Sequence, residues 1–165
     1  MPRLPLLLIA LLCLAEPAGA QWAEYPGAER DAALEAKAAE TARTAPPGRG
    51  RGAAVLVTPD SFEAVLDFYR RRGREASQPP RPGRAEYERD LPGGFRQGPN
   101  GREAVASGVK VKHVIVILDG AAEPALSKDW VVIARPLVGA VKHEGDVFTY
   151  PDIRDTTVII RATRP

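Results

Sequence analysis

The stretch VKVKHVIVIL, residues 109–118, decides the fold that the sequence predicts. It begins with alternating apolar and polar residues and becomes apolar at every position from Val114 onward. Alternation is typical of a half-buried strand, whereas a continuous apolar run is typical of a strand covered on both faces. We therefore expect a strand whose second half is central in a sheet and which ends at Asp119-Gly120.

A helix precedes this strand in TPDSFEAVLDFYRRRG, residues 58–73. Its large apolar side chains recur at helical spacing and form one face: Phe62, Val65, Leu66 and Tyr69. Thr58 suits the N-cap, and Gly73, after three arginines, suits the C-terminal end. We expect the apolar face of this helix to pack on the sheet.

Three other segments have the length and composition of strands: residues 53–57, 130–134 and 156–162. With the helix and the strand already described, they give the order β-α-β-β-β. This order predicts an α+β fold of two layers, in which one main helix packs on one sheet. The predicted domain covers residues 53–165.

A long loop is expected inside this domain, at residues 74–107. The segment holds five prolines and five glycines, and turn-forming residues at this density indicate irregular structure. We expect a flexible excursion, with a short extended lead-in around residues 103–106.

The first 20 residues have the layout of a secretory signal peptide. Arg3 supplies positive charge, residues 6–15 form an apolar run, and the small residues 18–20 suit the peptidase. The run is too short for a permanent transmembrane helix, which needs about 20 residues. We expect cleavage after Ala20 and a periplasmic or secreted protein, and the richness in Ala, Arg, Gly and Pro is typical of a GC-rich bacterial genome. Cleavage would also remove Cys13, the only cysteine.

Residues 21–52 are expected to lie outside the main domain. An aromatic segment from Trp22 ends in a turn at Pro26-Gly27, and an alanine-rich helix is predicted from Ala28 to Arg43. Leu34 is the only large apolar residue of that helix, so we expect a peripheral helix that buries little surface. Residues 45–52, APPGRGRG, have the composition of a linker.

Composition and motifs exclude several classes of function. The net charge of +2 lacks the basic excess of a nucleic-acid-binding protein. No serine lies in a nucleophile motif and no phosphate-binding loop occurs. We therefore assign no catalytic, cofactor-binding or metal-binding residue, and we expect a protein that is not an enzyme.

Two histidines are the candidate metal ligands. His113 stands among apolar residues of the predicted central strand, where a structural role is favoured. His143 and Glu144, with Asp146, offer nitrogen and oxygen ligands that zinc accepts, although a loop of solvated charges has the same composition. The sequence leaves open whether either histidine binds a metal.

Several short motifs run along the chain: YPGA at 25–28, TxDSFExVxxFY at 58–69, DGA at 119–121, RP at 135–136 and IRDxT at 153–157. On these motifs the chain resembles a group of uncharacterised secreted bacterial domains. The resemblance spans nearly the whole chain after the signal peptide. It implies a shared fold and no particular activity.

The stretch DSFEAVLDFYRRRG, residues 60–73, is similar to a helix of the vicinal oxygen chelate, or glyoxalase-like, superfamily. That similarity implies βαβββ modules, two of which cup a divalent metal held by His and Glu side chains. This chain departs from the pattern, since residues 53–57 hold no histidine. It also offers a single module, so a complete site would need a dimer.

Taken together, these observations predict a non-catalytic binding or envelope accessory protein. Its partner would be an envelope protein or a small ligand, whose identity the sequence does not indicate. The alternative is a metal-dependent glyoxalase-like enzyme formed by a dimer.

Overall fold

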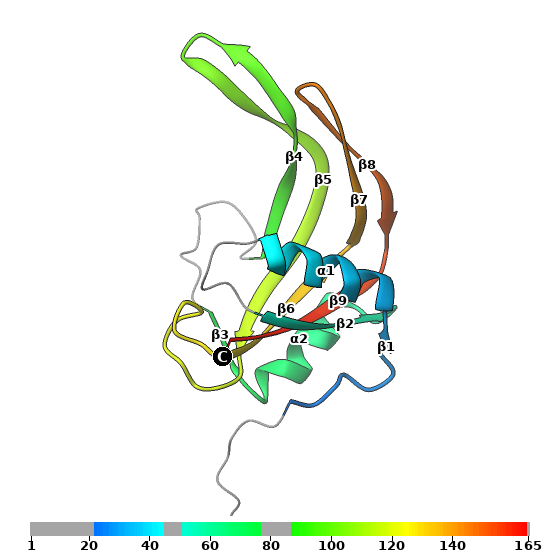
Figure 1. The fold of residues 1–165 in the computed structure, drawn as a ribbon, viewed down its shortest axis with the longest axis vertical. Helices are drawn as coiled ribbons and strands as arrows, with labels where there is room; N and C mark the ends of the chain where they lie inside the picture. Colours follow the sequence, from blue (N-terminus) through cyan, green and yellow to red (C-terminus); the bar gives the residue numbers. More distant parts are fainter. Residues whose placement is uncertain (1–21, 45–50, 77–86, 165) are drawn as a thin grey trace, which may run out of the picture.

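The computed structural model describes residues 22–44, 51–76 and 87–164. In these residues two short helices accompany a nine-stranded sheet, whose neighbouring strands are all antiparallel and which curls into a half-barrel (Figure 1). The expected two-layer α+β fold is therefore wrong, because the protein is mostly antiparallel sheet. The expected signal peptide at residues 1–20 lies outside the described residues, and so does most of the expected linker.

The elements have the following bounds. The helices are α1, Ala32–Thr44, and α2, Phe62–Arg70. The strands are β1, Glu29–Arg30; β2, Arg51–Thr58; β3, Arg74–Glu75; β4, Glu88–Gly98; β5, Gly101–Ile117; β6, Asp129–Arg135; β7, Leu137–Glu144; β8, Val147–Arg154; and β9, Thr157–Thr163.

The strand order in the sheet is β1-β2-β9-β6-β5-β4-β8-β7, and β3 pairs with β5 beside that path. The four segments expected to be strands correspond to β2, β5, β6 and β9, which are neighbours at the centre of the sheet. The N-terminal β2 pairs with the C-terminal β9, in a register that sets Val57 opposite Val158. The predicted strands are thus present, but they form less than half of the sheet.

One face of the central strands is covered by α2. The expected apolar face of this helix is buried, with Val65 and Tyr69 each 0% exposed. It packs on side chains of the central strands: Leu56, Val114, Val116, Val131, Ile133 and Ile159. The N-cap is Ser61, whose Oγ accepts a hydrogen bond from the Ala64 amide at 3.2 Å. The expected N-cap, Thr58, instead ends β2 as a buried residue.

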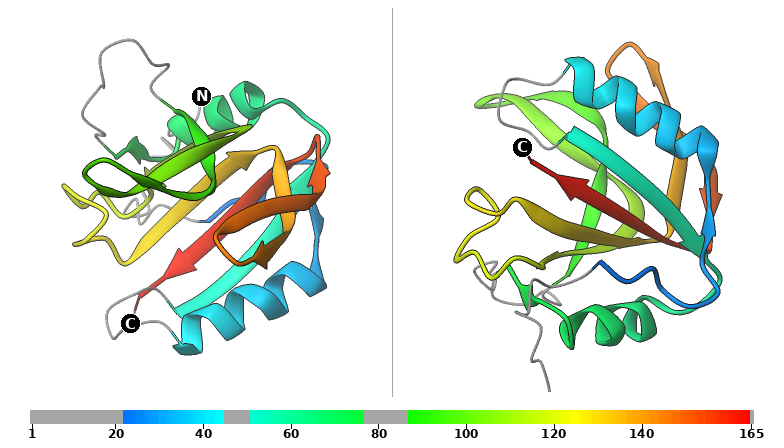
Figure 2. Two further views of the ribbon diagram at one scale, coloured as in Figure 1. Left: turned by 90° about the horizontal axis from the view of Figure 1, so that it is seen from above. Right: turned by 60° about the horizontal axis from the view of Figure 1, so that its bottom comes forward.

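The other face of the sheet is approached by α1, so the two helices lie on opposite sides of the sheet (Figure 2). Leu34 and Ala38 of α1 pack against a small buried cluster of Val55, Leu137 and Val158. The helix expected to be peripheral therefore covers part of the sheet. It buries little surface of its own, but it borders the space that the curled sheet encloses.

Most of the expected loop is a long β-hairpin. Of residues 74–107, the segments 88–98 and 101–107 belong to β4 and β5, and residues 77–86 lie outside the described part. The register of β4 shifts between Asp90 and Pro92 and again between Pro92 and Gly94. These bulges accommodate a proline and two glycines in a strand that has a full-length partner on one side only.

The hairpin of β7 and β8, which the sequence did not indicate, bends back over the sheet. It joins β4 at a single residue pair, Gly94 with Val147. A Cβ atom at Gly94 would lie 2.2 Å from the Asp146 carbonyl oxygen, and its φ is 141°. Only glycine permits this approach without displacement of the backbone. The pair therefore fixes the curl of the sheet at one point.

Candidate functional site

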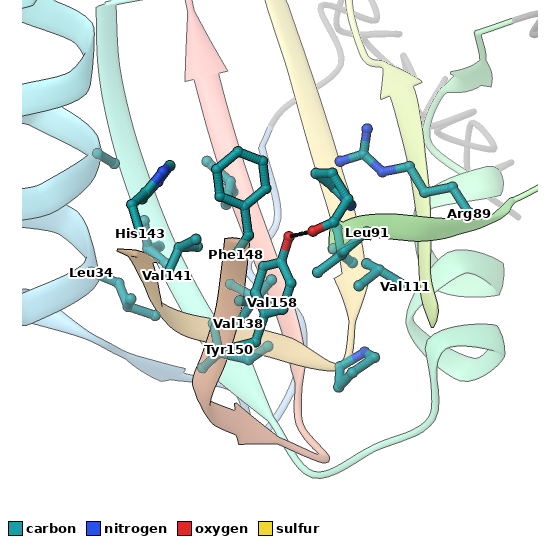
Figure 3. A pocket seen from close by; sticks show the side chains of 17 residues that line it. Leu34, Arg89, Leu91, Val111, Val138, Val141, His143, Phe148, Tyr150 and Val158 are labelled. Atoms are coloured by element: carbon teal, nitrogen blue, oxygen red, sulfur yellow. Dashed lines mark hydrogen bonds between the residues drawn. The ribbon is translucent and has the colours of Figure 1, made fainter. Parts of the chain in front are cut away.

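A cavity of about 520 Å³ lies on the concave side of the curled sheet, partly open to solvent (Figure 3). Most of the residues that line it are apolar: Leu34, Ala38, Val55, Leu91, Pro92, Val111, Ala134, Pro136, Leu137, Val138, Val141, Phe148, Val158 and Ile160. The polar ones are Arg89, His143 and Tyr150. The lining residues come from α1, from the link between β6 and β7, and from seven strands that are far apart in the sequence.

The floor of the cavity consists of alternate residues of the central strands. Val158 and Ile160 of β9 point to this side, whereas Ile159 between them packs under α2. Ala134 of β6 is directly opposite Val158. Because successive side chains of a strand face opposite sides of a sheet, one set of strands supplies both the core under α2 and the floor of the cavity. The alanine leaves room above it.

One wall is α1, which is held to the sheet by hydrogen bonds. Asp31 caps the helix, since its Oδ1 accepts a hydrogen bond from the Leu34 amide at 3.0 Å. The Val55 amide of β2 donates to Glu35 Oε1 at 3.1 Å. Lys37 Nζ donates to the Gly139 carbonyl oxygen of β7 at 2.9 Å. The helix thus bridges β2 and β7, which are not neighbours in the sheet.

The opposite wall is the β7–β8 hairpin, which contributes aromatic as well as aliphatic side chains. Phe148 contacts both His143 and Phe95, with ring centroids 4.5 and 5.7 Å apart and edge-on geometry. The Tyr150 hydroxyl donates to the Pro92 carbonyl oxygen at 2.5 Å. This hydrogen bond connects the hairpin to β4 and gives the Tyr150 hydroxyl a partner. Tyr150 therefore presents its ring to the cavity.

Arg89 brings a positive charge to the edge of the cavity. It stands on β4, opposite Val111 of β5. In Figure 3 its guanidinium reaches over the β4 side of the cavity, and His143 lies on the far side beyond Phe148. Across the described ranges, no acidic side chain forms an ion pair with Arg89. The site therefore combines apolar walls with a cation at the rim.

His113 lies on β5, opposite Ala134, and its Nδ1 is buried with no hydrogen-bond partner among the described residues. Burial lowers the pKa of His113, and the positive charge of Arg89 lowers it further, although a backbone hydrogen bond at Tyr87 acts in the opposite direction. His113 is therefore neutral near pH 7.

The residues considered as zinc ligands are not brought together. His143 packs on Phe148, and Asp146 pairs with Arg102. Within the part of the chain that the structure describes, no group of three or more His, Cys, Asp or Glu side chains could hold a metal ion. His113 and His143 lie on different strands and make different contacts.

A second, polar hollow of about 370 Å³ lies beside the N-terminus of α2. Its charges are engaged with one another. Lys112 bonds Glu63 at 2.5 Å, Lys110 bonds Glu88 at 3.0 Å, and Arg135 bonds Asp155 at 2.9 Å. These pairs leave the apolar cavity as the better candidate site.

Comparison with family models, with curated proteins and with solved structures finds no significant match. No helix in the described residues is long and apolar enough to span a membrane.

The sequence did not indicate the cavity. Most of its lining residues sit in β4, β7 and β8, which were not recognised, or in α1, which was expected to bury little. The alternation of residues in β9 was the one available signal. Val158 and Ile160 face away from α2, so they need apolar partners on the opposite face of the sheet.

Proposed function

We propose that this chain is an exported binding protein, and that it holds a small apolar molecule in the cavity between α1, the central strands and the β7–β8 hairpin. The observation that carries the proposal is the cavity itself. Its 520 Å³ falls within the range of about 300–1,000 Å³ found for small-molecule sites. A concave, mostly apolar lining with a few polar groups is the usual composition of such sites.

Removal of apolar surface from water supplies the affinity. Transfer of a ligand into the cavity buries apolar surface on both partners, at about 25 cal/mol per Å². The walls are fixed by hydrogen bonds that bridge elements: Lys37 to β7, Glu35 to β2 and Tyr150 to β4. A site that is already formed loses little conformational entropy when it binds.

Export accounts for residues 1–20 in this proposal. Their charged start, apolar run and small-residue end match a secretory signal peptide. A binding protein outside the cytoplasm fits a chain whose cysteine lies only in that leader, because its fold then needs neither a reduced thiol nor a disulfide.

Ala134→Leu tests the cavity directly. The three added carbons project from the floor and reduce the volume of the cavity by about 75 Å³. This value assumes about 25 Å³ per carbon, as in a cavity of another protein that holds benzene. The protein is expressed with residues 1–20 in place and then purified. Titration calorimetry should show that it binds both 1-dodecanol and dodecanoate. The variant should bind both ligands at least about tenfold more weakly, which corresponds to about 1.4 kcal/mol.

The matched control is Ala104→Leu, which makes the same change on an exposed position of β5 outside the cavity. It should bind both ligands as the unmodified protein does. If neither ligand binds, or if Ala134→Leu leaves binding unchanged, the proposed function is wrong.

A further inference from the structure

The charged side chains in the lining of the cavity are all basic. Of the described residues that line it, none is Asp, Glu or Lys, and Arg89 carries the only full charge. The other basic side chain in the lining is that of His143, which can only add positive charge. A ligand that fills the cavity therefore meets apolar walls along its length and a cation at one end.

The position of Arg89 suits a ligand that lies partly outside the cavity. Its side chain is exposed, while Leu91 and Val111 beside it line the interior. In Figure 3 the guanidinium lies above Leu91, at the edge of the cavity. A polar head group at this point keeps contact with water and avoids the cost of burial.

Electrostatics at the rim favour an anion. The charge of Arg89 acts on its surroundings, since it contributes to the lowered pKa of the neighbouring His113. Guanidinium groups bind carboxylates and phosphates through paired N–H donors. Apolar walls next to the group reduce the screening of its charge by water.

From this arrangement we infer that the ligand is an amphiphile with a single apolar chain and an anionic head group, the chain in the cavity and the head group on Arg89. The inference rests on the proposed function and adds the chemical class of the ligand. A fatty acid and a phosphate monoester of a long-chain alcohol share this chemistry.

The volume limits the length of the chain. An apolar cavity of about 150 Å³ accepts benzene, or about 25 Å³ per carbon. At that density, 520 Å³ would hold at most about 20 carbons. Because the cavity is partly open, a dodecyl chain is a suitable probe.

The experiment compares four dodecyl probes that differ only in the head group: dodecanoate, dodecyl phosphate, 1-dodecanol and dodecyltrimethylammonium. Each is titrated below its critical micelle concentration into the unmodified protein, into Arg89→Gln and into Arg96→Gln. Arg96 is the matched control, because it lies on the same strand but pairs with Glu103 away from the cavity.

The unmodified protein should bind the two anions about tenfold more tightly than the alcohol, and the ammonium most weakly. Arg89→Gln should remove this preference and leave the affinity for the alcohol unchanged, whereas Arg96→Gln should change neither. The ratio of the affinities for dodecanoate and dodecyl phosphate identifies which of the two head groups the site prefers.

Two results would overturn the inference. Equal affinity for all four probes, or a preference for anions that persists in Arg89→Gln, would show that Arg89 does not select the ligand, and the proposed function would stand. Absence of binding by every probe would remove the proposed function and the inference together.

Discussion

At the scale of single residues, Arg89 and His113 form the most informative pair. Burial and the charge of Arg89 together hold the pKa of His113 below the ordinary histidine value of about 6.5. In the unfolded chain the ordinary value is restored, so that below about pH 6.5 the unfolded state binds more protons than the folded state. The contribution of His113 to stability is therefore complete above that pH and is lost as the pH falls towards its folded pKa.

Arg89→Gln should raise the pKa of His113 towards the ordinary value, because it removes the neighbouring positive charge. An NMR titration of the ring protons of His113 measures this directly, because the chain has only two histidines. In Arg96→Gln the pKa of His113 should be unchanged. Equal values of the His113 pKa in all three proteins would show that Arg89 does not act on it.

At the scale of elements, the curl of the sheet depends on the contact between β4 and β8. Gly94→Ala should lower the free energy of unfolding by about 1–3 kcal/mol, because the new Cβ meets the Asp146 carbonyl at 2.2 Å in a strained backbone conformation. Urea denaturation measures the change. Binding of dodecanoate should weaken as well, since the hairpin wall moves.

Gly101→Ala is the control for backbone strain alone. Gly101 also has a positive φ, of 111°, but no atom lies within 4 Å of the Cβ position. It should cost less stability than Gly94→Ala and should leave ligand binding intact. Equal effects on stability and binding would mean that the contact with β8 is unimportant.

The elements that could be predicted from the sequence are those whose periodicity is strong. The face from Phe62 to Tyr69 of α2 and the apolar second half of β5 are examples. The predictions failed where polar residues and turn formers occupy strands, as in β4 with Pro92. Such strands are stabilised by cross-strand pairing and bulges, and neither leaves a hydrophobic period in the sequence.

The wrong fold class follows from the same cause. With β4, β7 and β8 unrecognised, the remaining elements satisfied a two-layer arrangement. The cavity could not be predicted, because its residues come together only when the sheet curls and α1 bridges β2 and β7. No local pattern encodes a contact such as that between Lys37 and Gly139.

At the scale of the whole molecule, the proposal requires export. Leu8→Arg places a charge in the apolar run of the leader, at a cost of about 2.5–3.5 kcal/mol for membrane insertion. The variant should accumulate in the cytoplasm with residues 1–20 attached. Cell fractionation followed by intact-mass analysis measures this, and the unmodified protein should begin at Gln21 outside the cytoplasm. Retention of the leader on exported protein would contradict cleavage after Ala20.

The pairing of β2 with β9 bears on how the molecule is made. On a ribosome, residues 51–58 emerge long before residues 157–163, and until then both β2 and β6 lack the strand that lies between them. Contacts between distant parts of a sequence slow folding. The nascent chain therefore lacks the strand between β2 and β6 until synthesis of β9 is complete, and under the proposed export this interval would keep the chain open for translocation.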